Sequence, residues 1–325
     1  MVNPVFIAGC GRSGTSYLRT IVDAHPRVFI PSESLFIIDY LRYGHRIPKG
    51  LLKWLFFHEP QLRCWYSGKS FDIDSIPEAI ARVHQTEAQK HGAVIWGQKT
   101  PRFVNHMDLI ESAFPGTRWI LIYRDPRGVA ASMKRSGQHT SSVRQACRRW
   151  LRDNRAVLEI KKGFSTPDNV LLLKYEELVT DYDAMLRTLF GFLSLEPLTR
   201  EDVNRLGKPV FFDRSRFTIN TVRGNMDPDP GIIHRWKDIL SVDEVSFIES
   251  TCSGEMKILG YESCMDAGPA AGTISPAGRL KDLMIPLRYL VKWPEYIFFT
   301  VLRYILLRYL PVLRRGSRNS RNGES

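Results

Sequence analysis

A glycine-rich stretch near the start of the chain carries the residues best suited to bind an anion. Gly9 to Ser16 reads Gly-Cys-Gly-Arg-Ser-Gly-Thr-Ser and directly follows the apolar run Val5 to Ala8. The residues after it place apolar side chains at helical spacing, so a strand, a tight turn and a helix are expected in succession. In that arrangement the backbone N–H groups and the positive end of the helix dipole surround a phosphate or sulfate.

This stretch differs from a nucleotide-triphosphate loop in one chemical respect. Gly9 and Gly14 have the spacing of the G-x-x-x-x-G-K-[ST] motif, but Thr15 stands where the motif has its lysine. The cation is instead Arg12, inside the loop. A guanidinium there can bind a phosphate or a sulfate, although the lysine that bridges the β- and γ-phosphates is missing. A plain glycine turn in an α/β protein is the alternative.

Elements farther along the chain must bring other charged groups to this loop. Three ionisable side chains follow apolar runs that we expect to be strands: Glu33 after Val28 to Ile30, Lys99 after Ala93 to Trp96, and Arg124 after Trp119 to Tyr123. Strands that alternate with helices predict an α/β domain with a central parallel sheet flanked by helices. Ligands bind where the carboxyl ends of such strands meet, so Arg12, Lys99 and Arg124 are expected on one rim. Ser132, on the helix after Arg124, can face the same ligand.

Composition divides the chain into four parts. Residues 1–265 are expected to form the single α/β domain, and residues 266–278 have the glycine and proline content of a linker. Residues 279–315 are dense in apolar and basic side chains, which is typical of an amphipathic helical extension on an anionic bilayer. Packing of this extension on the protein itself is the alternative. Residues 316–325 are expected to be disordered.

The totals limit the possible partners and the compartment. The net charge of +12 suits an anionic ligand, polymer or membrane surface. Five scattered cysteines without a C-x-x-C pair indicate neither a zinc site nor a dense disulfide framework, and favour a reducing compartment. The chain begins without a secretory signal pattern and has no run of about 18 apolar residues. We therefore expect a cytoplasmic protein, with peripheral contact to the inner face of a membrane.

Five motifs, in this order, resemble the sulfotransferases that use 3′-phosphoadenosine 5′-phosphosulfate (PAPS). They are Gly11 to Ser16, Gly97 to Pro101, Tyr123 to Arg127 with Ser132, Tyr175 to Leu178, and Trp236-Lys237 before Leu259 to Tyr261. The resemblance covers about residues 4–265. It is closer to the Golgi-type and bacterial branch, which includes tyrosylprotein and carbohydrate sulfotransferases, than to the cytosolic branch with a catalytic histidine. It implies a P-loop-like domain that moves a sulfuryl group from PAPS to an acceptor hydroxyl by in-line displacement, without a metal.

The resemblance also implies which residues bind the donor. The 5′-phosphosulfate would lie in the first loop, which comprises Gly11, Arg12, Ser13, Gly14, Thr15 and Ser16. Arg124 and Ser132 match the part of the pattern that binds the 3′-phosphate, where the planar fork of an arginine can pair two oxygens. Arg235 resembles a basic residue that lines the nucleotide site, and Arg223 is its rival for that role.

Three residues are candidates for catalysis under the same resemblance. Glu33 follows the His25-Pro26 turn, as the catalytic glutamate does in this branch, and would take the proton of the acceptor hydroxyl. Lys99 would neutralise the bridging oxygen as the phosphate leaves, with Arg12 on the phosphosulfate. His106 is an alternative base. The structural alternatives are a helix-terminal charge for Glu33 and a surface position for Lys99.

Two other functions fit parts of the sequence, and the acceptor is left open. A nucleotide-dependent kinase of similar architecture would use Asp125 for a metal but lacks the expected lysine. A non-enzymatic protein that binds membranes or polyanions would explain the charge but not the ordered motifs. Nucleic acid is not an expected partner. Aromatic side chains within residues 35–95 favour a carbohydrate or glycolipid hydroxyl as acceptor, while a lipid, a small metabolite or a peptidyl tyrosine stays open.

Overall fold

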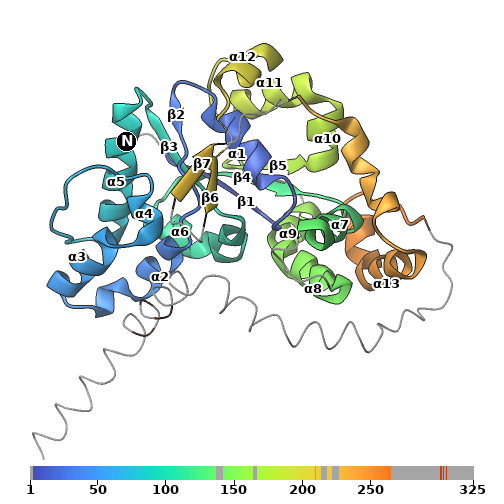
Figure 1. Ribbon diagram of the computed structural model, residues 1–325, viewed down its shortest axis with the longest axis horizontal. Coiled ribbons are helices and arrows are strands. Elements are labelled where there is room, and N and C mark those ends of the chain that lie inside the picture. The colour runs from blue at the N-terminus through green and yellow to red at the C-terminus, as the bar shows by residue number, and fades with distance from the viewer. Residues whose placement is uncertain are drawn as a thin grey trace, which may run out of the picture.

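A five-stranded parallel sheet lies at the centre of the chain (Figure 1). The computed structural model describes residues 3–136, 142–163, 167–208, 210–213, 218–221 and 227–264, together with residues 301, 303 and 305. The strands are β1 (Val5–Gly9), β2 (Val28–Phe29), β3 (Ile95–Lys99), β4 (Arg118–Tyr123) and β5 (Val170–Lys174). Their order is β2-β3-β1-β4-β5 and every pairing is parallel, which confirms the predicted fold class.

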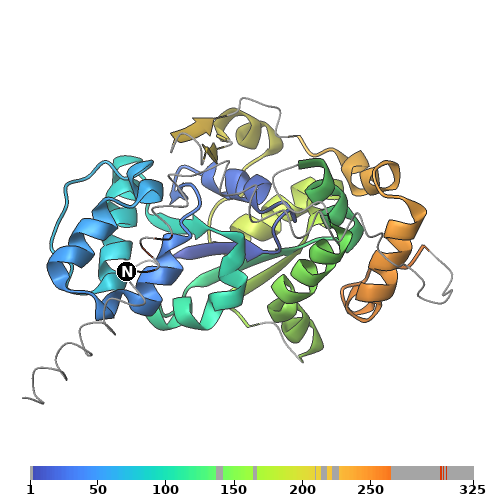
Figure 2. The same ribbon diagram turned by 60° about the horizontal axis from the view of Figure 1, so that its bottom comes forward.

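Helices cover both faces of this sheet (Figure 2). Alternate side chains of β1 point to opposite faces of the sheet, since Phe6 and Ala8 belong to one buried cluster while Val5 and Ile7 belong to the other. The Val5 side is covered by α1 (Thr15–Asp23), α10 (Tyr175–Thr180), α11 (Tyr182–Phe192) and α12 (Arg200–Leu206).

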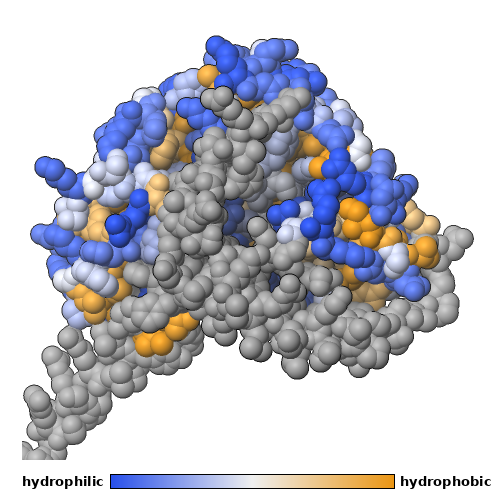
Figure 3. Space-filling view, in the orientation of Figure 1, coloured by the Kyte–Doolittle hydropathy of each residue, from blue (hydrophilic) through white to orange (hydrophobic). Residues whose placement is uncertain are grey.

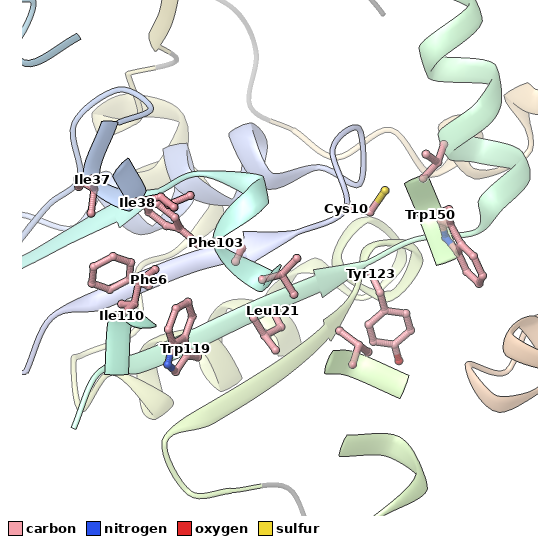
Figure 4. Close-up of a cluster of buried hydrophobic side chains, with 14 of the residues drawn as sticks. Phe6, Cys10, Ile37, Ile38, Phe103, Ile110, Trp119, Leu121, Tyr123 and Trp150 are labelled. Atoms are coloured by element: carbon pink, nitrogen blue, oxygen red, sulfur yellow. The ribbon is translucent and has the colours of Figure 1, made fainter. Parts of the chain in front are cut away.

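The larger core lies on the Phe6 side, where aromatic residues of neighbouring strands meet (Figure 4). Phe6 and Trp119 have ring centroids 5.4 Å apart, and Trp150 reaches the same cluster from a helix. The main helices of this side are α6 (Met107–Ala113), α7 (Pro126–Ser136), α8 (Val143–Asp153), α9 (Arg155–Lys162) and α13 (Val242–Ile258).

Four further helices on the Phe6 side form what we call the helical cap. They are α2 (Phe36–Tyr43), α3 (Lys49–Phe57), α4 (Pro60–Arg63) and α5 (Ile76–Lys90). Short 3₁₀ helices complete the description: η1 (Gly44–Arg46), η2 (Pro101–His106), η3 (Pro230–Ile233) and η4 (Arg235–Asp238). The sequence of residues 35–95 predicts helices with irregular connections, which these elements confirm.

Three local predictions from the sequence pattern were wrong: a single basic helix over residues 141–163, a long loop over residues 207–235, and a buried parallel strand over Val170 to Lys174. The basic helix expected over residues 141–163 is divided into α8 and α9 at Asn154, whose backbone leaves the helical conformation with a φ of −97° and a ψ of 3°. The Asn154 side chain donates to the Trp150 carbonyl at 2.8 Å beside this break. Residues 207–235 were expected to form a long loop but contain the antiparallel pair β6 (Val210–Asp213) and β7 (Thr218–Thr221). Strand β5 is only half-buried, because it lies at an edge of the sheet.

Part of the predicted domain organisation falls on residues that the structure does not describe. The linker at 266–278, the tail at 316–325 and most of the extension at 279–315 lie outside the described residues. Across the residues that the structure describes, no helix combines the length and apolar character that a membrane span requires. The boundaries of these parts stay predictions.

Candidate active site

The anion-binding loop predicted from Gly9 to Ser16 joins β1 to α1 through left-handed backbone. Arg12 has a φ of 76° and Gly14, the residue before α1, a φ of 93°. A Cβ on Gly14 would come within 2.4 Å of the Tyr175 ring, so only glycine fits there. The left-handed conformation of Arg12 is unusual for a residue with a side chain, and such strain concentrates at functional sites.

Two arginines and a serine meet at this loop, as the sequence predicts. Arg12 Nε donates to Ser132 Oγ at 3.1 Å, and Arg124 Nη1 donates to the Arg12 carbonyl at 3.3 Å. The Arg124 guanidinium lies 4.1 Å from the centroid of the Tyr175 ring. Its Nε is buried and has no hydrogen-bond partner among the described residues. An unsatisfied cationic donor at a glycine loop is what an anion site requires.

The charge around Arg12 points to the same conclusion. Burial lowers the pKa of Arg12, and the positive charges of Arg124, Arg135 and Arg149 lower it further. Cations that destabilise one another in this way are stabilised together by a bound anion. Burial raises the pKa of the neighbouring Cys10 thiol to about 12, so this thiol stays neutral.

Lys99 connects the loop to Glu33. Lys99 Nζ donates to Glu33 Oε1 at 2.5 Å and to Ser16 Oγ at 3.2 Å. The Lys99 side chain is only 6% exposed, whereas that of Glu33 is 29% exposed. The lysine is therefore an interior cation held against the start of α1, and the glutamate is open to a molecule arriving from solvent. The surface alternative for Lys99 is wrong, because the lysine is buried.

A buried polar chain lies behind this pair, on the other side of β3. Gln98 Nε2 donates to Ser34 Oγ at 2.8 Å and to His84 Nε2 at 3.0 Å. His84 Nδ1–H donates in turn to the Ile80 carbonyl at 2.7 Å. Burial lowers the pKa of His84 to about 4, so its imidazole is neutral and can accept from Gln98.

This chain fixes the residues next to the candidate catalytic pair. The Ser34 N–H donates to Thr100 Oγ1 at 3.2 Å, which joins the Glu33 turn to the end of β3. Gln98 and Thr100 are the neighbours of Lys99, and Ser34 is the neighbour of Glu33. These hydrogen bonds fix the backbone next to Glu33 and next to Lys99, and therefore the position of one side chain relative to the other. Sequence reasoning missed Gln98, although strand alternation directs its side chain away from that of Lys99.

Arg149 of α8 is a further cation beside the loop that the motifs did not reveal. A Cβ on Gly11 would come within 2.4 Å of Arg149 Nη2. Arg149 Nε pairs with the buried Asp153 at 3.3 Å, and Asp153 also accepts from Asn105 Nδ2 at 3.0 Å. Arg149 is therefore anchored between the loop and η2. The basic composition of residues 141–163 was the only signal in the sequence.

Two other candidates make different contacts. Arg235 forms a partly exposed ion pair with Asp229 at 2.6 Å, so its role at the nucleotide stays a prediction. Arg223, the rival for this role, lies outside the described residues. His106 Nδ1 lies 3.1 Å from Arg42 Nη2, and burial followed by that positive charge lowers the pKa of His106.

The remaining motif residues brace the site. Asp125, the candidate metal ligand of the kinase alternative, accepts from Arg127 through both carboxylate oxygens. Glu176 accepts from the Asp125 N–H at 3.1 Å and from the Tyr261 hydroxyl at 2.9 Å, so its carboxylate joins the residue after Arg124 to the residues that follow α13.

Comparisons with known proteins agree on one family. Residues 4–200 match the model described as the sulfotransferase family. A putative protein-tyrosine sulfotransferase of Caenorhabditis briggsae is 21% identical over 271 residues, which cover 80% of this chain and 89% of that protein. Protein-tyrosine sulfotransferase 1 of Danio rerio is 28% identical over 199 residues, which cover 59% of this chain and only 53% of the fish enzyme.

Two solved structures share the fold. The sulfotransferase domain from the curacin biosynthetic pathway has a TM-score of 0.50 at 18% identity, and the match covers 81% of this chain and 99% of that domain. The sulfotransferase domain from the Synechococcus PCC 7002 olefin synthase has a TM-score of 0.51 at 19% identity, with 81% and 97% covered. At these identities the likeness concerns the fold alone.

Proposed function

Because the chain belongs to the sulfotransferase family and is therefore a transferase of sulfuryl groups, we propose that its donor is PAPS and that Gly9 to Ser16 bind the 5′-phosphosulfate. Backbone N–H groups of Gly11 to Ser16, the hydroxyls of Thr15 and Ser16, and the Arg12 guanidinium provide the donors. Burial and the neighbouring cations together lower the pKa of Arg12, and the charge of those cations supports an anion at this point.

Arg124 and Ser132 bind the 3′-phosphate in this proposal. The buried Arg124 Nε without a partner among the described residues supplies a donor for it. Ser132 Oγ accepts from Arg12 in the structure, and its own O–H can donate to a phosphate oxygen. Arg235 lies on η4, next to η3, whose Ile232 carbonyl accepts from Arg124 at 3.5 Å. We include Arg235 as a further contact to the nucleotide.

The position of Lys99 between Glu33 and Ser16 is the observation that carries the proposed mechanism. The acceptor oxygen attacks the sulfur of PAPS from the side opposite the phosphate, and the bond between sulfur and the bridging oxygen breaks. Glu33 takes the hydroxyl proton as the new S–O bond forms. Lys99 and Arg12 stabilise the negative charge that develops on the departing phosphate. Positioning and charge stabilisation supply the rate enhancement.

For the acceptor we propose a hydroxyl of a carbohydrate or glycolipid. The aromatic content of residues 35–95 supports this choice, because aromatic rings that are open to solvent pack well on sugar faces. A peptidyl tyrosine is the second candidate, favoured by the relatives that are named protein-tyrosine sulfotransferases.

Mass spectrometry of acceptor mixtures incubated with PAPS tests this function. We expect one sulfuryl group to be added to a sugar hydroxyl, and addition to a tyrosine-containing peptide would select the second candidate. Mg-ATP in place of PAPS provides the control for the kinase alternative. Phosphate transfer from Mg-ATP, without sulfuryl transfer from PAPS, would contradict the proposal.

A further inference from the structure

A single arginine from the C-terminal extension is buried in the helical cap. The Arg303 side chain is 3% exposed, although it lies far along the chain from the cap. Its Nη1 donates to Glu59 Oε2 at 2.5 Å, and its Nε and Nη2 donate to Asp39 Oδ2 at 3.1 and 2.9 Å. We call these three residues the arginine lock. The expected alternative, in which part of the extension packs on the protein, is supported at this residue.

The cap is built to receive a cation at this point. The Glu59 side chain is 1% exposed, and it precedes α4 in a region of apolar residues. Burial raises the pKa of Glu59, while the charge and hydrogen bond of Arg303 counteract that rise. A buried carboxylate without a partner is strongly unfavourable. Arg303 is the cation that compensates the charge of Glu59, so the Arg303–Glu59 pair is a buried part of the cap rather than a chance surface contact.

The residues on either side of Arg303 face the opposite way. Val301 and Ile305 are helical and are 47% and 48% exposed. They are four residues apart and share one helix face, whereas Arg303 lies about 200° around the helix from Val301. Trp54, which is 48% exposed, lies on α3, the helix that leads to Glu59. Hydrophobic side chains also gather at the lower left of Figure 3, where Figure 1 shows the cap.

The chemistry of the neighbouring sequence selects the partner. Basic residues are interspersed with apolar ones on both sides of Val301 and Ile305: Arg288, Lys292, Arg308, Arg314 and Arg315. Apolar side chains flanked by cations in the sequence complement a bilayer that contains anionic lipid. The apolar side chains can enter the acyl region, and the anionic headgroups attract the cations. The overall charge of +12 adds to this attraction.

We propose that Val301 and Ile305 form a docking surface for an anionic lipid bilayer, and that the arginine lock fixes this surface to the catalytic domain. The lock gives the domain a defined orientation at the membrane, with the helical cap next to the lipid. The inference does not depend on the sulfuryl transfer reaction.

Vesicle cosedimentation of the full chain tests the docking surface. The wild type is expected to bind vesicles of phosphatidylcholine mixed with phosphatidylglycerol, and to bind pure phosphatidylcholine much less. The double variant Val301→Asp/Ile305→Asp is expected to weaken binding by roughly tenfold or more, because two apolar groups are lost and two anions face the lipid. Val242→Asp is the matched control, since Val242 is 68% exposed on α13, and it should bind as the wild type does.

Three outcomes would overturn the docking surface. The first is a wild type that does not bind the anionic vesicles. The second is a double variant that binds them as well as the Val242→Asp control. The third is a wild type that is dimeric and a double variant that is monomeric by analytical ultracentrifugation, with vesicle binding unchanged. The surface would then be a contact between subunits.

Cleavage in the linker tests the lock. A protease site placed in residues 266–278 of the full chain allows the two parts to be separated after purification. We expect the C-terminal fragment to stay with the wild-type domain, which keeps its vesicle binding after cleavage. In the Arg303→Ala variant the fragment should dissociate and carry the vesicle binding with it. Equal retention of the fragment in both proteins would overturn the lock.

Discussion

The anion-binding loop and the arginine lock both depend on arginines, but the sequence reveals them to different degrees. The loop gathers its groups within Gly9 to Ser16, so their spacing alone indicates the chemistry. Arg303 pairs with Glu59 and Asp39 across 244 and 264 residues. No local pattern marks such a pair. Chemistry that depends on backbone geometry can be predicted from a short motif, whereas a buried ion pair between distant segments needs the fold.

The two regions also differ in what their charges do. Around Arg12, burial and the neighbouring cations outweigh the opposing charge of Glu33, which is suitable for binding an anionic ligand and costs stability in its absence. In the lock, Arg303 pairs with two carboxylates, so its charge is compensated within the protein. We therefore expect changes at the loop to alter activity with little effect on folding, and changes at the lock to do the reverse.

Replacing Lys99 is expected to have the largest effect. Lys99→Ala should lower kcat on the order of a thousandfold, about 4 kcal/mol, because the departing phosphate loses its buried cation. Steady-state rates with PAPS measure this. Lys53→Ala is the control, since Lys53 pairs with Asp72 at the surface and should leave kcat unchanged. A Lys99→Ala variant that retains most of its kcat would remove the lysine from the mechanism.

Breaking the lock is expected to lower stability instead. Arg303→Ala leaves Glu59 buried without its cation, so the free energy of unfolding should fall by about 3 kcal/mol. Urea denaturation of the full chain measures this. Adding Glu59→Gln to Arg303→Ala should restore part of the loss, because the unpaired charge is then removed. Lys49→Ala, at an exposed pair with Asp74, is the comparison that should leave the unfolding midpoint where it is.

The buried His84 lies behind the catalytic pair and should make stability depend on pH. Its folded pKa is about 4 and its ordinary value is 6.5, so the unfolded chain binds more protons between these values. Stability contributed by His84 is therefore complete above pH 6.5 and decreases as the pH falls toward 4, by roughly 2–3 kcal/mol. Urea midpoints of the wild type and of His84→Phe should converge over this range. Parallel pH profiles would show that His84 is not the responsible group.

Gln98 should have the smallest effect and the most specific one. Gln98→Leu removes the bonds to Ser34 and His84 while Lys99 stays in place. We expect kcat to fall about tenfold, because Glu33 and Lys99 are no longer held in a fixed position relative to each other. The affinity for adenosine 3′,5′-bisphosphate is expected to be unchanged. Calorimetry and steady-state kinetics separate the two quantities. Loss of nucleotide affinity together with kcat would indicate a general structural defect.

Part of the fold and of the site could be predicted, because it depends on the sequence of residues within short segments. The alternation of strands and helices gave the parallel sheet, and strand ends brought Arg12, Lys99 and Arg124 to one rim as expected. The break at Asn154 is a change in the backbone conformation of a single residue, which helix propensity does not reveal.

The supporting residues could not be predicted, because their roles depend on contacts between distant elements. Arg149 is recognisable only by its approach to Gly11, and His84 only by its burial beside Gln98. In the sequence, each looks like an ordinary member of a helix. Arg303 looks like one of several basic residues in the extension, and its carboxylate partners lie in a region that matched no motif.

The central claim is that the loop and Arg124 together hold a ligand with two separate anionic groups. Calorimetric titration with adenosine 3′,5′-bisphosphate and with adenosine 5′-monophosphate, which lacks the 3′-phosphate, tests this most directly. The wild type should prefer the bisphosphate by about a hundredfold, because Arg124 makes charge-assisted bonds to the 3′-phosphate, and Arg124→Ala should abolish the preference. Equal affinity of the wild type for the two nucleotides would contradict the account.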